Sequence, residues 1–168
     1  MRLRDNPIIQ VSRNLPCTPE QAWALVTDIA LPTQVDGELQ RAEWIDGADG
    51  VAPGARFRGF NASDAMGEWT TLSEVVDFED GRRWVWSVGP DSADTAGASW
   101  ATWGFEVDPT RDGCVVRQFA RAGDGDSPFA AVVAATPEKE GRIIDYRLNV
   151  WRQGMEANLD AVEAALAP

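Results

Sequence analysis

The C-terminal part of the chain carries an apolar stripe with helical spacing, and this stripe limits the possible folds more than any other feature. When successive residues are placed about 100° apart, the stripe residues fall within about 60° of one direction. They are Ile144, Leu148, Trp151, Met155, Leu159, Val162 and Leu166. The spacing predicts an amphipathic helix of up to roughly 30 residues, or roughly 45 Å. Such a helix needs a large apolar surface to cover its stripe.

Residues 39–121 have the pattern of consecutive β-strands separated by turns rich in Gly and Asp. The expected strands are Leu39–Ile45, Ala55–Asn61, Glu68–Phe78, Arg83–Val88, Trp100–Val107 and Val115–Arg121, after a first strand at Ile8–Ser12. Short turns between consecutive strands predict antiparallel pairing. The separation of strands from helices along the chain is typical of the α+β class.

Two short helices are expected between the first strand and the others. Thr18 is a good N-cap, Pro19 suits the first helical position, and Gln21 completes a capping box. Pro32 predicts the start of a second, shorter turn. A further apolar helix is expected from Pro128 to Ala135, where it either covers the mouth of a ligand space or packs as an ordinary connection.

This order of elements predicts one domain over residues 1–168 with an α+β fold. A curved antiparallel sheet of about seven strands is expected to wrap around the long C-terminal helix, with the two short helices after the first strand. A curved sheet around a single helix leaves a concave apolar space between them. Small ligands bind in such spaces.

The composition excludes several kinds of chemistry. The chain has no His, which rules out a Ser-His-Asp system, an imidazole general base and a His-ligated metal site. The two cysteines, Cys17 and Cys114, are too few for a four-cysteine zinc site. We therefore expect neither a metal ion nor another cofactor, and any chemistry must use mainly carboxylates, arginines or amides.

The charge and hydropathy of the chain restrict its partners. There are 27 Asp and Glu residues against 15 Lys and Arg residues, and a net charge of -12 repels phosphate backbones. Nucleic acid is therefore not an expected partner. No apolar run approaches the length of a signal peptide or a membrane span, so we expect a cytoplasmic protein with free thiols and no membrane insertion.

Several segments carry a family resemblance. They are residues 15–23 (LPCTPEQAW), 54–61 (GARFRGFN), 68–75 (EWTTLSEV), 102–107 (TWGFEV) before Gly113, and the late Gly154-Met155. Across about residues 7–166 the chain resembles the START-like, helix-grip superfamily, and within it the polyketide cyclase/dehydrase and lipid-transport (SRPBCC) family. The resemblance implies a helix-grip fold. Because the family includes binders, carriers and cyclases, and these motifs hold no catalytic signature, no catalytic residue is assigned.

The alternation of side chains along strands predicts where the tryptophans point. Charged residues mark the outer face of several strands, so four tryptophans are expected to point inward and to meet Trp151 on the helix stripe. These four are Trp69, Trp84, Trp86 and Trp103. Trp23 is expected to pack the first helix on the sheet. Gln118 is expected to point inward, because its neighbours on the other face include two arginines.

The inward side chains are the candidate ligand-binding residues. They are Phe57, Asn61, Trp69, Trp86, Trp103, Phe105, Gln118, Trp151 and Met155. Two interpretations remain open: the aromatic rings fill the core, or some of them line a cavity in which Asn61 and Gln118 orient the ligand. Arg147 and Arg152 flank the helix stripe, either to reach an acidic ligand group or to pack along the helix. Tyr146 lies about 200° from Ile144 and is expected to face away.

Three functions are compatible with these features. The first is a binding module for a small hydrophobic or aromatic molecule, and the second is an aromatase/cyclase-type enzyme that uses the same cavity. The third is a protein-interaction module, which predicts an exposed apolar patch instead of a cavity. Buried ionisable groups with shifted pKa values inside the cavity would favour the enzyme. The sequence leaves open whether the protein forms a homodimer.

Overall fold

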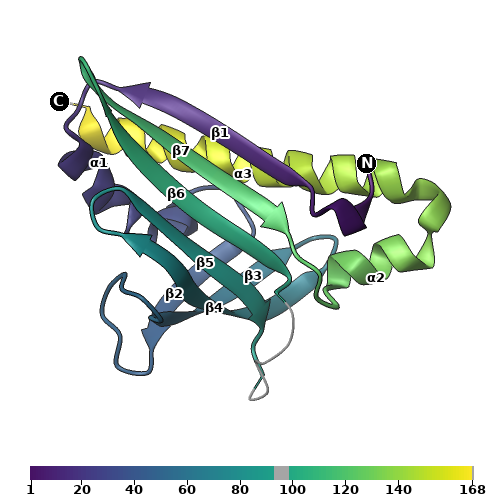
Figure 1. Cartoon of the computed structure of the whole chain (residues 1–168). Helices are drawn as coiled ribbons and strands as arrows, with labels where there is room; N and C mark the ends of the chain where they lie inside the picture. Colours follow the sequence, from purple (N-terminus) through teal and green to yellow (C-terminus); the bar gives the residue numbers. More distant parts are fainter. Residues whose placement is uncertain (93–98, 168) are drawn as a thin grey trace.

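A curved antiparallel sheet packs against one long helix in the computed structural model, which describes residues 1–92 and 99–167 (Figure 1). Within these residues the sheet has seven strands in the order β1-β7-β6-β5-β4-β3-β2, so β1 and β2 are its edges. The strands are β1 (Ile8–Leu15), β2 (Leu39–Ile45), β3 (Arg56–Ser63), β4 (Gly67–Glu79), β5 (Arg83–Pro90), β6 (Ala101–Thr110) and β7 (Gly113–Ala122).

The helices are α1 (Pro19–Val26), α2 (Pro128–Ala135) and the 27-residue α3 (Glu140–Leu166). Short 3-10 turns occupy Leu3–Asp5, Leu31–Gln34 and Pro137–Lys139. In Figure 1, α3 runs along the sheet beside β1, with α1 near its C-terminal end and α2 next to its N-terminal part. None of the described helices is both long and apolar enough to cross a membrane.

Local signals place the short elements as predicted. The hydroxyl of Thr18 accepts a hydrogen bond from the Gln21 backbone N–H at 3.3 Å, and the Gln21 side chain accepts one from the Thr18 backbone N–H at 3.0 Å. This reciprocal pair is the predicted capping box of α1. The turn at Pro32 is a 3-10 helix, and α2 has the predicted bounds with Ser127 as its cap.

The predicted strands are all present, although some of them begin or end at other residues than predicted. β1 continues to Leu15 instead of ending at Ser12, because it pairs with β7 along its whole length. A bulge between Val75 and Asp77 inserts one extra residue into β4. The bulge returns Phe78 to the inner face, where its ring lies 6.3 Å from that of Trp23 on α1. Trp23 therefore packs α1 on the sheet, as predicted.

The core lies between the inner face of the sheet and the stripe of α3. Six of the seven stripe residues are buried, and Leu166 near the end of the helix is half-buried. The helix begins at Glu140, four residues before Ile144, the first apolar residue of the stripe. Tyr146 is 68% exposed, which confirms that it faces away from the sheet.

Candidate ligand-binding site between sheet and helix

Strand register brings the candidate residues together on the inner face. Trp86 of β5 lies opposite Trp103 of β6, and Phe105 of β6 lies opposite Gln118 of β7. Asn61 of β3 lies opposite Trp69 of β4 at the other side of the sheet. Because directly opposed residues of antiparallel strands share a face and side chains alternate along each strand, these side chains belong to one face of the sheet.

Most of the candidate residues are buried and pack against one another. Phe57, Trp86, Phe105, Gln118, Trp151 and Met155 are all in this group. The rings of Trp84 and Trp86 stack at 4.1 Å, and Trp86 lies 6.0 Å from Phe105 and 6.3 Å from Phe57. The indole N–H of Trp84 donates to the Val26 carbonyl at 3.0 Å. This aromatic stack fills the space between α1 and the middle of the sheet.

The remaining candidates, Asn61, Trp69 and Trp103, are half-buried. Trp103 contacts Trp151 of α3, with ring centroids 5.2 Å apart. Phe129 of α2 approaches Trp151 edge-on at 6.5 Å, so α2 packs on the same cluster. The aromatic interior is therefore filled beside α1, whereas Trp103, next to α2 and α3, is only half-buried. The sequence placed α2 correctly but did not single out Phe129.

The amide side chains make hydrogen bonds inside the fold. Gln118 is 1% exposed, and its carbonyl accepts a hydrogen bond from Asn158 of α3 at 3.1 Å. The other oxygen of this pair, Oδ1 of Asn158, is buried without a partner. Asn61 donates to the hydroxyl of Thr71 at 3.3 Å. The sequence did not predict the role of Asn158, because the helix stripe was defined by apolar residues alone and Asn158 is a polar residue on the same face.

An ion pair lies beside the aromatic cluster of Trp103, Trp151 and Phe129. Arg147 of α3 donates two hydrogen bonds to Glu38, at 2.6 Å and 3.0 Å, and its guanidinium lies 5.6 Å from the Trp151 ring centroid. The Nε of Arg147 is buried without a partner. Arg147 therefore lies at the flank of the stripe, as predicted, whereas Arg152 is exposed. No sequence signal points to Glu38, which lies 109 residues away along the chain.

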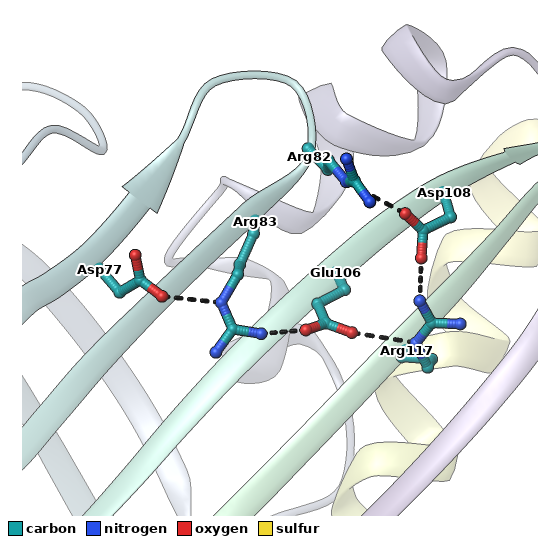
Figure 2. Close-up of polar contacts among 6 residues, drawn as sticks. All are labelled: Asp77, Arg82, Arg83, Glu106, Asp108 and Arg117. Carbon is teal, nitrogen blue, oxygen red and sulfur yellow. Dashed lines mark hydrogen bonds and ion pairs between the residues drawn. The ribbon is translucent and has the colours of Figure 1, made fainter.

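A network of charged side chains covers the outer face of β4 to β7 (Figure 2). Arg83 bridges Asp77 and Glu106, Arg117 bridges Glu106 and Asp108, and Arg82 also binds Asp108. The hydrogen bond to Asp77 is the main cause that raises the pKa of Arg83. The network surrounds a hollow of about 300 Å³. Since its three arginines are already matched with carboxylates, it offers no free charge to a ligand.

A second hollow, of about 470 Å³, lies where β1 leads into α1. Its lining runs from Pro16 to Gln21 and includes Asp112 of the β6–β7 turn and Gly113, the first residue of β7. Neither of these two hollows lies between the sheet and α3. Within the described residues, no group of three or more Cys, Asp or Glu side chains is arranged to hold a metal ion.

The architecture and the covered inner face define a helix-grip α+β protein. The model of the family described as polyketide cyclase / dehydrase and lipid transport matches residues 7–166, and the chain belongs to this family. No curated protein matches the chain.

Solved structures share the fold at low sequence identity. A polyketide-cyclase-like protein from Corynebacterium glutamicum is 23% identical with a TM-score of 0.62, and the match covers 99% of this chain and 92% of that one. The di-domain ARO/CYC StfQ of the steffimycin pathway is 17% identical with a TM-score of 0.71. The di-domain ARO/CYC BexL of the BE-7585A pathway is 14% identical with a TM-score of 0.70. The matches cover 96% and 99% of this chain but only 51% and 53% of the two di-domain proteins.

Proposed function

We propose that this protein binds a small hydrophobic or aromatic molecule between the sheet and α3, at the end where Trp103, Trp151 and Phe129 meet. The observation that carries the proposal is the partial exposure of Trp103. Its ring contacts the buried Trp151 at 5.2 Å, so it faces the helix and still reaches solvent. An indole surface of this kind is suited to stacking on a flat apolar ligand.

The polar groups around this aromatic cluster would orient the ligand. The backbone N–H of Ala62 donates to the Glu38 carbonyl at 2.9 Å, so Asn61 lies next to the Glu38–Arg147 pair. Asn61 and the unpartnered Nε of Arg147 would contact the polar end of the ligand. Phe57, Trp69, Trp86 and Gln118 would form the deeper wall, while Phe105 and Met155 support it from the core.

The proposal is tested by quenching of Trp fluorescence with two probes, anilinonaphthalene sulfonate for flat aromatics and palmitate for fatty acids. We expect at least one probe to bind. Trp103→Leu should weaken that binding roughly tenfold, which corresponds to about 1.4 kcal/mol. Trp23→Leu is the matched control, because Trp23 is also half-buried and packs on Phe78 at the other end of the fold.

The two variants separate specific binding from general damage. A wild-type protein that binds neither probe contradicts the proposal. Equal weakening in both variants, with equal loss of thermal stability, assigns the effect to the core and not to a site at Trp103. Native mass spectrometry of the purified protein adds an independent readout, since a bound small molecule increases the intact mass.

An aromatase/cyclase-type enzyme is the second candidate. The supporting observation is the half-buried ion pair of Arg147 and Glu38 beside the aromatic cluster, because a cyclase needs polar groups that polarise carbonyls or move protons. This candidate predicts that Glu38→Gln abolishes conversion of a poly-ketone chain while the affinity for the aromatic probe stays within about twofold. If Glu38→Gln changes neither turnover nor affinity, the pair serves only to fix α3.

A further inference from the structure

The two cysteines of the chain, 97 residues apart in sequence, lie with their sulfur atoms 3.6 Å apart. Both are free thiols. Cys114 is the second residue of β7 and pairs across the sheet with Leu15, the last residue of β1. Cys17 follows two residues later, just before the Thr18 cap of α1. The chain that follows β1 therefore places the Cys17 thiol next to the Cys114 thiol.

Close backbone packing fixes this arrangement. A Cβ atom on Gly113 would overlap the Leu15 carbonyl oxygen, so the segment at Leu15 and Pro16 lies directly against the start of β7. Cys17 and Cys114 flank this contact in the sequence. The close packing of these two backbone segments thus holds the two thiols near each other.

The two thiols differ in access. Cys114 is fully buried, at 0% exposure, and burial is the main cause that raises its pKa to about 12, with the hydrogen bond to Cys17 adding to it. Cys114 is therefore a protonated thiol at neutral pH. Cys17 is half-buried and lines the open hollow of about 470 Å³ at the start of α1. A small oxidant from solvent can reach Cys17 but not Cys114.

We propose that Cys17 and Cys114 form a redox-active thiol pair that a low-molecular-weight disulfide, such as glutathione disulfide, converts to an internal disulfide. The Cys17 sulfur, as thiolate, first attacks one sulfur of glutathione disulfide, and one glutathione leaves and takes up the proton. The Cys114 sulfur, on losing its proton, then attacks the Cys17 sulfur and displaces the second glutathione. Two protein thiols are oxidised and one glutathione disulfide is reduced to two glutathiones.

Proximity makes the second step favourable. A disulfide has an S–S length of about 2.05 Å, so the two sulfurs, now 3.6 Å apart, must approach by roughly 1.5 Å. Cys114 is a weak nucleophile because it is protonated, but a reacting pair held in contact behaves as if its concentration were very high. The pair lies at the α1 corner of the sheet, so the inference does not depend on the ligand site proposed beside α2.

The test treats the reduced full-length protein with glutathione disulfide at neutral pH and follows the intact mass. The wild type should lose two hydrogen atoms without retaining glutathione. Cys114→Ala should stop with one glutathione on Cys17. Cys17→Ala should stay unmodified while folded and react only after urea unfolds it. Cys114→Ser is a second variant in case the alanine leaves a cavity that prevents folding.

Each other outcome contradicts the proposal. A wild type that keeps a glutathione adduct shows that Cys114 does not resolve it, and a folded Cys17→Ala that reacts as fast as wild type shows that Cys17 is not the entry point. A dithiothreitol-sensitive dimer would mean pairing between chains. Oxidation should also raise the melting temperature of the wild type by roughly 5–15 °C, reversibly, since the bond closes a long loop. A fall in Tm would mean that the native geometry does not accommodate the bond.

Discussion

Two amide side chains meet in the buried interior of this fold. Asn158 and Gln118 are 5% and 1% exposed and join α3 to β7 through one hydrogen bond of 3.1 Å. A net hydrogen bond of this kind contributes only about 1 kcal/mol, but leaving one partner buried and unpaired costs about 1–3 kcal/mol. The pair therefore constrains how α3 is seated more than it adds to stability.

Gln118→Leu is expected to destabilise the protein by about 1–3 kcal/mol, because Asn158 then keeps its buried amide without an acceptor. Adding Asn158→Leu should recover part of this loss, since both polar groups are then removed together. Urea unfolding of the two single variants and the double variant measures the coupling. Strictly additive losses would show that the two amides do not act as a pair.

Glu140, at the start of α3, links the helix to the N-terminal segment. Its carboxylate accepts hydrogen bonds from the Leu3 backbone N–H at 2.8 Å and from Arg2 at 2.9 Å. The Leu3 N–H first, and Arg2 next, lower the pKa of Glu140 below its ordinary value of 4.5. Because the folded pKa is depressed, the stabilisation is fully present above 4.5 and is lost as the pH falls through the folded value.

Glu140→Gln should therefore lower the melting temperature at neutral pH, and the difference from wild type should shrink at about pH 3. Glu138→Gln is the matched control. It removes the same charge at an exposed position two residues away. A difference from wild type that stays constant from neutral to acid pH would contradict the assigned role of the carboxylate.

At the scale of single elements, the pairing of β6 with β7 depends on a glycine. Gly104 lies opposite Phe119, and a Cβ at Gly104 would overlap the Phe119 ring. The guanidinium of Arg83 lies 5.2 Å from the centroid of the same ring on the outer face. The absence of a side chain at Gly104 thus lets the ring lie flat across the strand under the charged network, which explains a glycine in the middle of a long strand.

Gly104→Ala is expected to destabilise the protein by about 1–3 kcal/mol, because the added methyl group displaces the Phe119 ring. Gly89→Ala in β5 is the matched control, since a Cβ atom on Gly89 would meet nothing within 4 Å, and it should be neutral. Guanidinium unfolding compares the two. Phe119→Ala should remove most of the added cost of Gly104→Ala, and an unchanged cost would rule out the ring as its cause.

Local sequence signals predicted the elements better than the contacts between them. The α1 cap follows from Thr18, Pro19 and Gln21 because each bond closes within one helical turn. The α3 stripe and the inward tryptophans follow from regular periodicities. The β4 bulge does not follow, since only pairing with β5 reveals that Val76 is extra.

Within the candidate site, the inward direction of Gln118 could be predicted from its strand neighbours, but its partner Asn158 could not. In the same way, the sequence did not predict that Glu38 pairs with Arg147 or that Cys17 lies beside Cys114. Each of these pairs joins residues far apart in sequence, and their distances are set by the curvature of the sheet and the seating of α3. Periodicity gives the direction of a side chain, whereas the identity of its partner depends on the whole fold.

At the scale of the whole molecule, ion pairs join α3 to both edges of the sheet. Arg147 joins the helix to Glu38, which directly precedes edge strand β2. At the other edge, Arg13 of β1 points toward α3 and binds three carboxylates there, from Glu156, Asp160 and Glu163, at 2.8–3.0 Å. The hydrogen bond to Asp160 is the main cause that raises the pKa of Arg13. These contacts hold a curved open sheet around its helix and place a charge on the edge strand.

Arg13→Gln should lower the free energy of unfolding by about 1 kcal/mol at low ionic strength, because the partner carboxylates are largely exposed and each pair contributes only about 0.2–1 kcal/mol. Most of this loss should vanish near 1 M salt, where the screening length is about 3 Å. The chain carries a net charge of -12, so removing any arginine also increases its self-repulsion. Arg142→Gln, at an exposed position of α3, is the control for this general effect.

The difference between the two variants isolates the contribution of the β1 edge. If Arg13 ties this edge to α3, Arg13→Gln is less stable than Arg142→Gln at low salt, and amide exchange in β1 accelerates more than in β5 at the centre of the sheet. Equal stability of both variants at every salt concentration would mean that the apolar stripe alone seats the helix. In that case Arg13 would serve only as a charge on the edge strand that protects it from pairing with another chain.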